Sequence, residues 1–178
     1  MAEAPFPVEF AVLGLLARGP RHGYELKKEI ERELRPIWHI ATSRLYLALA
    51  RLEHAGLIRG EPQNTGGRAR RVYRLTADGE GRLWEWLRSP VPALRDLRVE
   101  FLAKIHFLLE LAPAEVPSLI AAEIEALERL RDRLAHEDPP CAGSPIAECV
   151  RGFRLGQVDA ALAWLRALQG KFSVEVVR

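Results

Sequence analysis

Arginine side chains gather beside the chain's one glycine pair. Arg68, Arg70 and Arg71 lie within five residues of Gly66-Gly67. Mutual repulsion makes such a cluster costly unless an anion lies nearby, and a guanidinium binds phosphate oxygens as a rigid fork. Residues 59–74 hold five Arg and one Glu, a local charge of +4. The pattern predicts contacts between these three arginines and phosphate groups, with a solvated turn as the alternative.

The sequence offers no arrangement typical of catalysis or metal binding. Its five histidines are scattered, and the HExxH, GxSxG and Walker patterns are absent. The glycine pair lacks the strand-to-helix context of a phosphate loop. Cys141 and Cys149 lie eight residues apart, with no further Cys or His at metal-ligand spacing. We therefore expect neither an enzyme nor a cofactor or metal site.

Composition indicates a globular protein of one or two small domains. Its 178 residues are 48% hydrophobic and 28% charged, with a net charge of only +2. The longest apolar run, residues 10–17, is far below the roughly 18 residues of a membrane span, and no basic leader is visible. The two cysteines predict free thiols in a reducing cytoplasm, with a disulfide or redox switch as the alternative.

The first half of the chain reads as short helices followed by a hairpin. Thr42 is the expected N-cap of the third helix, and Gly56 ends that helix in the left-handed conformation. Thr76 is placed to cap the fourth helix. The expected elements are helices at 7–18, 22–35 and 43–55, extended runs at 57–61 and 69–75, and a helix at 77–88. Three helices and a hairpin with a basic glycine tip describe a winged helix-turn-helix.

The helix at 43–55 has one apolar face and one face that suits DNA. At about 100° per residue, its buried stripe consists of Leu45, Ala48, Leu49 and Leu52. The opposite face contains Leu47 and Arg51 among small and hydroxyl side chains, and it has no Asp or Glu. Because the third helix of this fold enters the major groove, we expect this face to read DNA. The alternative is an ordinary solvated amphipathic helix.

The segment Ser89-Pro90-Val91-Pro92 predicts a boundary between domains 1–90 and 91–178. Lys and Arg outnumber Asp and Glu by 15 to 11 in the first half, a charge of +4, and number 11 against 13 in the second, a charge of −2. Beyond the boundary only helices are expected, at 93–111, 113–136 and 145–169. The predicted fold is mostly α with a small β-hairpin: a DNA-binding domain and a C-terminal helical domain.

The last helix has apolar residues over more than half of its circumference, whereas a surface helix needs a stripe only about 100° wide. One arc is therefore expected to pack on the same chain and the other on a second copy. The arc assigned to dimerisation consists of Ile146, Val150, Phe153, Trp164 and Leu168, and the other contains Val158, Leu162 and Leu165. Two alternatives remain: both arcs wrap a monomeric core, or Trp164 lines an effector pocket.

Three runs in the first half of the chain carry recognisable motifs: GPRHGYELKKEIE, SRLYLALARLEHAGLI and RRVYRLTADGEGRLWEWL. Together they resemble the PadR family of bacterial transcriptional regulators. The resemblance is specific over about residues 11–88 and looser beyond. One departure is Leu47, where family members often carry Pro after the Tyr. That position faces DNA, so operator preference cannot be inferred from relatives, and a Leu there can contact thymine methyls.

The resemblance implies a homodimer that binds a palindromic operator, usually as a repressor, and releases it when a small molecule binds. By position, it assigns Ser43, Arg44 and Tyr46 to the start of the recognition helix, with Thr42 the neighbouring candidate. The predicted partners are double-stranded operator DNA, a second copy of the chain and a small-molecule effector, with no membrane. The rival interpretation is a winged-helix module that binds proteins and never touches DNA.

Overall fold

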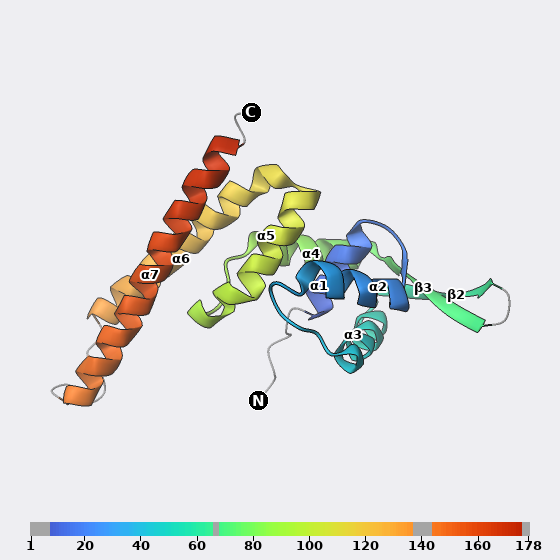
Figure 1. Cartoon of the computed structure of the whole chain (residues 1–178), viewed down its shortest axis with the longest axis horizontal. Coiled ribbons are helices and arrows are strands. Elements are labelled where there is room, and N and C mark those ends of the chain that lie inside the picture. The colour runs from blue at the N-terminus through green and yellow to red at the C-terminus, as the bar shows by residue number, and fades with distance from the viewer. Residues whose placement is uncertain (1–7, 66–67, 137–143, 176–178) are drawn as a thin grey trace. The chain divides into compact units, whose positions relative to one another are not determined.

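The computed structural model describes residues 8–65, 68–136 and 144–175 (Figure 1). The first part contains α1 (Val8–Ala17), β1 (Arg21–His22), α2 (Gly23–Glu29), η1 (Ile30–Leu34), α3 (Thr42–His54), β2 (Ile58–Thr65), β3 (Arg68–Leu75) and α4 (Ala77–Arg88). The second part contains η2 (Leu94–Arg98), α5 (Glu100–Leu111), η3 (Pro113–Glu115), α6 (Val116–His136) and α7 (Pro145–Glu175). The fold is mostly helical with one small sheet, as predicted. None of the described helices has the length and hydropathy that a bilayer crossing requires.

The sheet confirms the predicted hairpin and extends it. β2 pairs antiparallel with β3, from Ile58 opposite Leu75 to Thr65 opposite Arg68. The predicted tip, Gly66-Gly67, lies outside the described residues. β1 adds a third strand on the other side of β3, with Arg21 opposite Tyr73. The order of helices and strands is that of a winged helix-turn-helix.

The helix α1 is the centre of the first core. Its residues from Phe10 to Leu16 are all buried, and it packs against both α3 and α4 (Figure 1). The buried face of α3 consists of the four predicted residues, Leu45, Ala48, Leu49 and Leu52. Burying this stripe leaves the opposite face of α3 exposed.

Capping residues determine where α3 and α4 begin and where α3 ends. Gly56 has φ +72°, the left-handed conformation predicted for it. Thr76 Oγ1 accepts a hydrogen bond from the Gly79 N–H at 3.1 Å, so the predicted cap of α4 is confirmed. The predicted cap at Thr42 is wrong, because the helix begins one residue earlier. Ala41 is the N-cap, without a side-chain hydrogen bond, and its carbonyl accepts from the Arg44 and Leu45 N–H groups.

The chain packs as two compact units, and their division differs from the predicted one. The described residues up to Arg88 pack together with Arg98–Leu111, whereas Ser89–Leu97 packs with the described residues from Ala112 onward. The proline-rich segment does begin the second unit. However, α5 belongs to the first unit, because its apolar residues Phe101 and Phe107 are completely buried there. The first unit is therefore a winged helix with α5 added to its core.

Two contacts fix α5 within the first unit. A Cβ built on Gly14 of α1 would lie 2.6 Å from the Phe107 ring, so α1 and α5 approach closely at this point. The Trp86 indole donates a hydrogen bond to Glu100 Oε1 at 2.8 Å, and its ring stacks on Phe10 with centroids 4.6 Å apart. These contacts join α5 to both α1 and α4.

The second unit is built around the pairing of α6 and α7 (Figure 1). Val158, Leu162 and Leu165 of α7 are buried, as expected for the arc that packs on its own chain. Ion pairs on the outside reinforce the contact, with Arg131 2.6 Å from Asp159 and Arg166 2.7 Å from Glu128. Leu127 of α6 is buried in the same unit.

Candidate nucleic-acid interface

The exposed face of α3 presents a surface without acidic groups. Tyr46 and Leu47 are about half exposed, at 49% and 51%, although both are large side chains. The remaining exposed residues of this helix are Thr42, Ser43, Arg44, Ala50, Arg51 and His54. All six predicted DNA contacts on α3 therefore lie on its exposed side. The chemistry of this face is hydroxyl, guanidinium and apolar, which suits phosphate oxygens, guanine edges and thymine methyls.

Arg51 has an acidic neighbour that sequence reasoning missed. Its guanidinium Nη1 lies 3.6 Å from Glu9 Oε1 of α1, and 62% of its side chain is exposed. A loose, exposed pair of this kind is worth little. The Arg51 guanidinium can therefore separate from Glu9 at a small cost in free energy. This weak pairing is compatible with the predicted base reading by Arg51.

The basic stretch of the hairpin is more closely paired than its composition suggests. Arg71 lies 2.6 Å from Glu53, while Arg59 and Arg74 lie 3.6 Å and 3.7 Å from Glu61. The backbones of Arg68 and Arg70 are in β3, opposite Thr65 and Gln63. Their side chains lie outside the described residues.

An open hollow of about 600 Å³ lies where α2, α3 and β3 meet. It is lined by His22, Gly23, Tyr24, Glu25, Tyr46, Arg71 and Tyr73. The His22 ring is held from one side, because its Nδ1 lies 3.2 Å from the Arg71 carbonyl oxygen and must donate to it. Burial raises the pKa of Tyr73, so its phenol stays protonated at neutral pH. Tyr24, 59% exposed, was not predicted as a site residue, although it stands in the quoted GYEL run.

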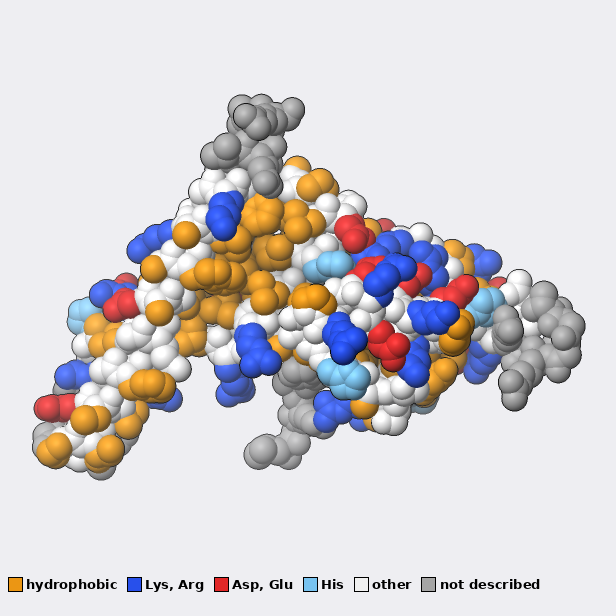
Figure 2. Space-filling model, in the orientation of Figure 1, with side chains coloured by type: hydrophobic (Ala, Val, Ile, Leu, Met, Phe, Trp, Pro, Cys, Tyr) orange, Lys and Arg blue, Asp and Glu red, His pale blue; other side chains and the backbone are white. Residues whose placement is uncertain are grey.

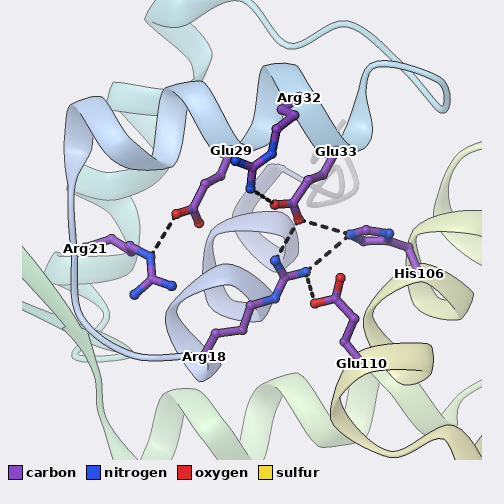
Figure 3. Close-up of polar contacts among 7 residues, drawn as sticks. All are labelled: Arg18, Arg21, Glu29, Arg32, Glu33, His106 and Glu110. Carbon is purple, nitrogen blue, oxygen red and sulfur yellow. Dashed lines mark hydrogen bonds and ion pairs between the residues drawn. The ribbon is translucent and has the colours of Figure 1, made fainter.

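A second polar cluster joins α1, η1 and α5 around Arg18 (Figure 3). Arg18 Nη1 donates to Glu33 Oε2 at 2.6 Å, and Nη2 contacts both Glu110 and the His106 Nε2, the latter at 3.3 Å. Within the described residues, Glu33, His106 and Glu110 are close enough to share a metal ion. Because the Arg18 guanidinium already occupies the centre of this trio, the cluster is a cation site filled by the protein itself.

The arc of α7 assigned to dimerisation is exposed along much of its length. Ile146, Val150 and Phe153 are 69%, 47% and 66% exposed, and Trp164 is 41% exposed. Leu168 is half-buried. Figure 2 shows the hydrophobic side chains that follow α7 from its N-terminal end. Cys149 is an exposed free thiol on the same helix, and Cys141 lies outside the described residues.

Comparisons with known proteins relate part of the chain to transcriptional regulators. Residues 12–85 match the family model described as the transcriptional regulator PadR-like family. The negative transcriptional regulator PadR of Bacillus subtilis is 28% identical over 119 residues, which are 66% of this chain and 65% of that protein. The matched stretch thus spans slightly less than two thirds of the length of the curated relative.

Solved structures of regulators are also similar. The structure of Bacillus subtilis PadR with operator DNA is 24% identical, with a TM-score of 0.47, and covers 93% of this chain and 98% of its own. The same protein has been solved with p-coumaric acid. A transcriptional regulator from Clostridium thermocellum is 32% identical, with a TM-score of 0.41, over 44% of this chain and 75% of its own.

The family match covers the helices α2 and α3, the hairpin and most of α4, which together present the acid-free face and the basic strands described above. Over residues 12–85, the chain is therefore similar to the PadR-like family of transcriptional regulators.

Proposed function

We propose that this chain is a repressor that binds a palindromic operator as a homodimer. The observation that carries the proposal is the exposed face of α3, where none of the exposed residues of the helix is Asp or Glu. In this arrangement, Thr42 and Ser43 lie at the helix N-terminus, where backbone N–H groups favour a phosphate. Arg44, Tyr46, Leu47 and Arg51 lie further along the groove, and Arg68 and Arg70 contact the DNA backbone beside the hairpin.

The exposed apolar arc of α7 supports the proposed homodimer. Ile146, Val150 and Phe153 form an unpartnered row on one face of a 31-residue helix. Exposed apolar side chains that gather on one face of a helix are typical of a protein–protein interface. A symmetric dimer would present two copies of α3 to successive major grooves, which requires a palindromic site with half-sites about one helical turn apart.

The repressor role and the response to a small molecule are drawn from the sequence relative. Bacillus subtilis PadR is a negative regulator, and it has been solved with p-coumaric acid. We propose that this chain is likewise released from DNA by a small aromatic molecule. Thermal unfolding in the presence of phenolic acids, dyes and antibiotics would identify the compounds that stabilise the protein.

The decisive experiment is selection of duplexes from a random-sequence library, followed by footprinting and binding titrations on the selected site. We expect a footprint with two-fold symmetry. Changing Arg68 and Arg70 together to Ala should weaken binding about equally for the selected and an unrelated duplex and flatten the salt dependence. A protein that selects no duplex would instead be a protein-interaction module.

A further inference from the structure

We propose that Arg71 positions α3 against the hairpin and does not itself contact DNA, an inference that rests on the proposed DNA binding. Glu53 Oε1 accepts two hydrogen bonds, one from Arg71 Nη2 at 2.6 Å and one from the Gly60 N–H at 3.1 Å. Arg71 Nη2 also donates to the Gly60 carbonyl at 3.1 Å. These three residues, here called the helix–wing clamp, belong to α3, β2 and β3.

Glu53 is the only acidic residue in the sequence of α3. A carboxylate on a helix that approaches DNA repels phosphate unless its charge is neutralised. Glu53 lies beside the buried stripe, with 29% of its side chain exposed, and its charge is directed to the hairpin through Arg71. Glu53 therefore helps to attach α3 to the hairpin, and the face of α3 that is proposed to read DNA has no negative charge.

A side chain at position 60 would collide with the helix–wing clamp. A Cβ at position 60 would lie 2.8 Å from Glu53 Oε1 and 3.0 Å from both Arg71 Nη2 and Tyr73 Cε1. Contacts this short cannot be tolerated without displacing the carboxylate or the guanidinium. The variant Gly60→Ala is thus a way to disturb the clamp without changing any charge.

Arg71 has two further contacts. Its guanidinium lies 5.9 Å from the centre of the Tyr73 ring, and its backbone carbonyl accepts the His22 Nδ1–H at 3.2 Å, which ties β3 to His22. Turning the guanidinium toward DNA would take it away from the Glu53 carboxylate and from the Gly60 carbonyl, both of which it contacts in the folded chain. The geometry therefore favours a positioning role.

The test asks whether removing the Glu53 carboxylate raises or lowers the affinity for DNA. If only charge mattered, Glu53→Ala would raise the affinity for DNA. We expect it to lower the affinity for a duplex selected by the wild-type protein by about tenfold, within the coupling range of contacting residues. Arg71→Ala and Gly60→Ala should give similar losses, and the double variant Glu53→Ala/Arg71→Ala should be no worse than either single variant.

The matched control is Glu61→Ala, which removes an acid from the same hairpin, where Glu61 lies 3.6 Å from Arg59. It should leave the affinity unchanged or raise it. Glu53→Gln, which keeps an acceptor for the Gly60 N–H, gives the same test in a milder form if Glu53→Ala folds poorly. Thermal unfolding confirms that each variant is folded at the assay temperature.

The salt dependence separates positioning from direct contact. The slope of log affinity against log salt concentration should stay at the wild-type value for Arg71→Ala. A slope smaller in magnitude by about 0.9, the contribution of one phosphate contact, would overturn the inference, as would a higher affinity of Glu53→Ala. Wild-type protein that binds no duplex refutes the proposed function and this inference together, whereas the two outcomes above refute the inference alone.

Discussion

The Phe107 ring of α5 lies against Gly14 of α1, so closely that a Cβ on Gly14 would come within 2.6 Å of it. The glycine lies inside a helix, where Ala is normally preferred by about 0.5–1 kcal/mol. The absence of a side chain at position 14 is therefore a packing requirement. It allows α5 to bury its aromatic face in the core of the winged helix.

Replacing Gly14 with Ala should destabilise the protein. Overpacking of this kind typically costs about 1–3 kcal/mol in the free energy of unfolding, and denaturant unfolding would measure it. The control is Gly81→Ala in α4, where a Cβ meets no atom within 4 Å. That change should stabilise the protein by about 0.5–1 kcal/mol. Equal effects of the two substitutions would show that the contact between Gly14 and Phe107 does not limit packing.

Acid should weaken the cluster around Arg18. Burial alone raises the pKa of Glu33, but hydrogen bonds and charges from Arg18 and Arg32 outweigh it, so its pKa lies below the ordinary 4.5. A carboxyl with a lowered pKa stabilises the fold above its unfolded pKa, and this stabilisation is lost as pH falls through the folded value. The melting temperature should therefore fall more steeply for the wild type than for Glu33→Gln between about pH 5 and pH 3. Parallel curves would contradict the assignment.

Disrupting the exposed arc of α7 should separate the proposed dimer. Phe153→Asp places a charge where an apolar contact is expected, and an interface residue of this kind is worth about 2 kcal/mol or more. The dimer dissociation constant should then rise at least about thirtyfold, as measured by light scattering over a dilution series. The control is Glu148→Lys, about 140° away around the helix, which should leave the mass unchanged. A wild-type monomer at micromolar concentration would refute the dimer.

Arg51→Ala should reduce sequence discrimination more than general affinity for DNA. A guanidinium that reads a guanine edge contributes about 1–3 kcal/mol of discrimination against the wrong base. The measurement is the ratio of affinities for the selected duplex and for single-base variants of it. Arg82→Ala on α4, where Arg82 pairs with Glu85, removes the same charge away from α3 and should preserve the ratio. An unchanged ratio for Arg51→Ala would assign Arg51 to a role other than base reading.

The helices and the hairpin were predictable because their signals are local. The apolar stripe of α3, the glycine at its end and the cap at Thr76 each follow from short-range spacing. The strand β1 was missed because two residues, Arg21 and His22, carry no alternation to detect. The π-helical turn Ile30–Leu34, which ends the second helix, has no sequence pattern of its own and was predicted only as helix.

The candidate site was less predictable where residues distant in sequence meet. The acid-free face of α3 could be read from helical angles alone. The pairing of Arg71 with Glu53, 18 residues away, depends on how the hairpin lies beside the helix. Counting charges along the sequence gives no information on that packing. The same limitation applies to α5. The segment 89–92 looks like a linker, and only the burial of Phe101 and Phe107 assigns the following helix to the first unit.

The placement of α5 determines how the chain can be divided into fragments. A piece that ends at Arg88 contains every residue of the family match, with α3 and the hairpin, yet it lacks the helix that covers Gly14 and that hydrogen-bonds Trp86. Such a fragment would expose the edge of its own core to water. The smallest fragment that keeps the core of the winged helix covered therefore has to extend to Leu111, and it has to include the segment 89–97.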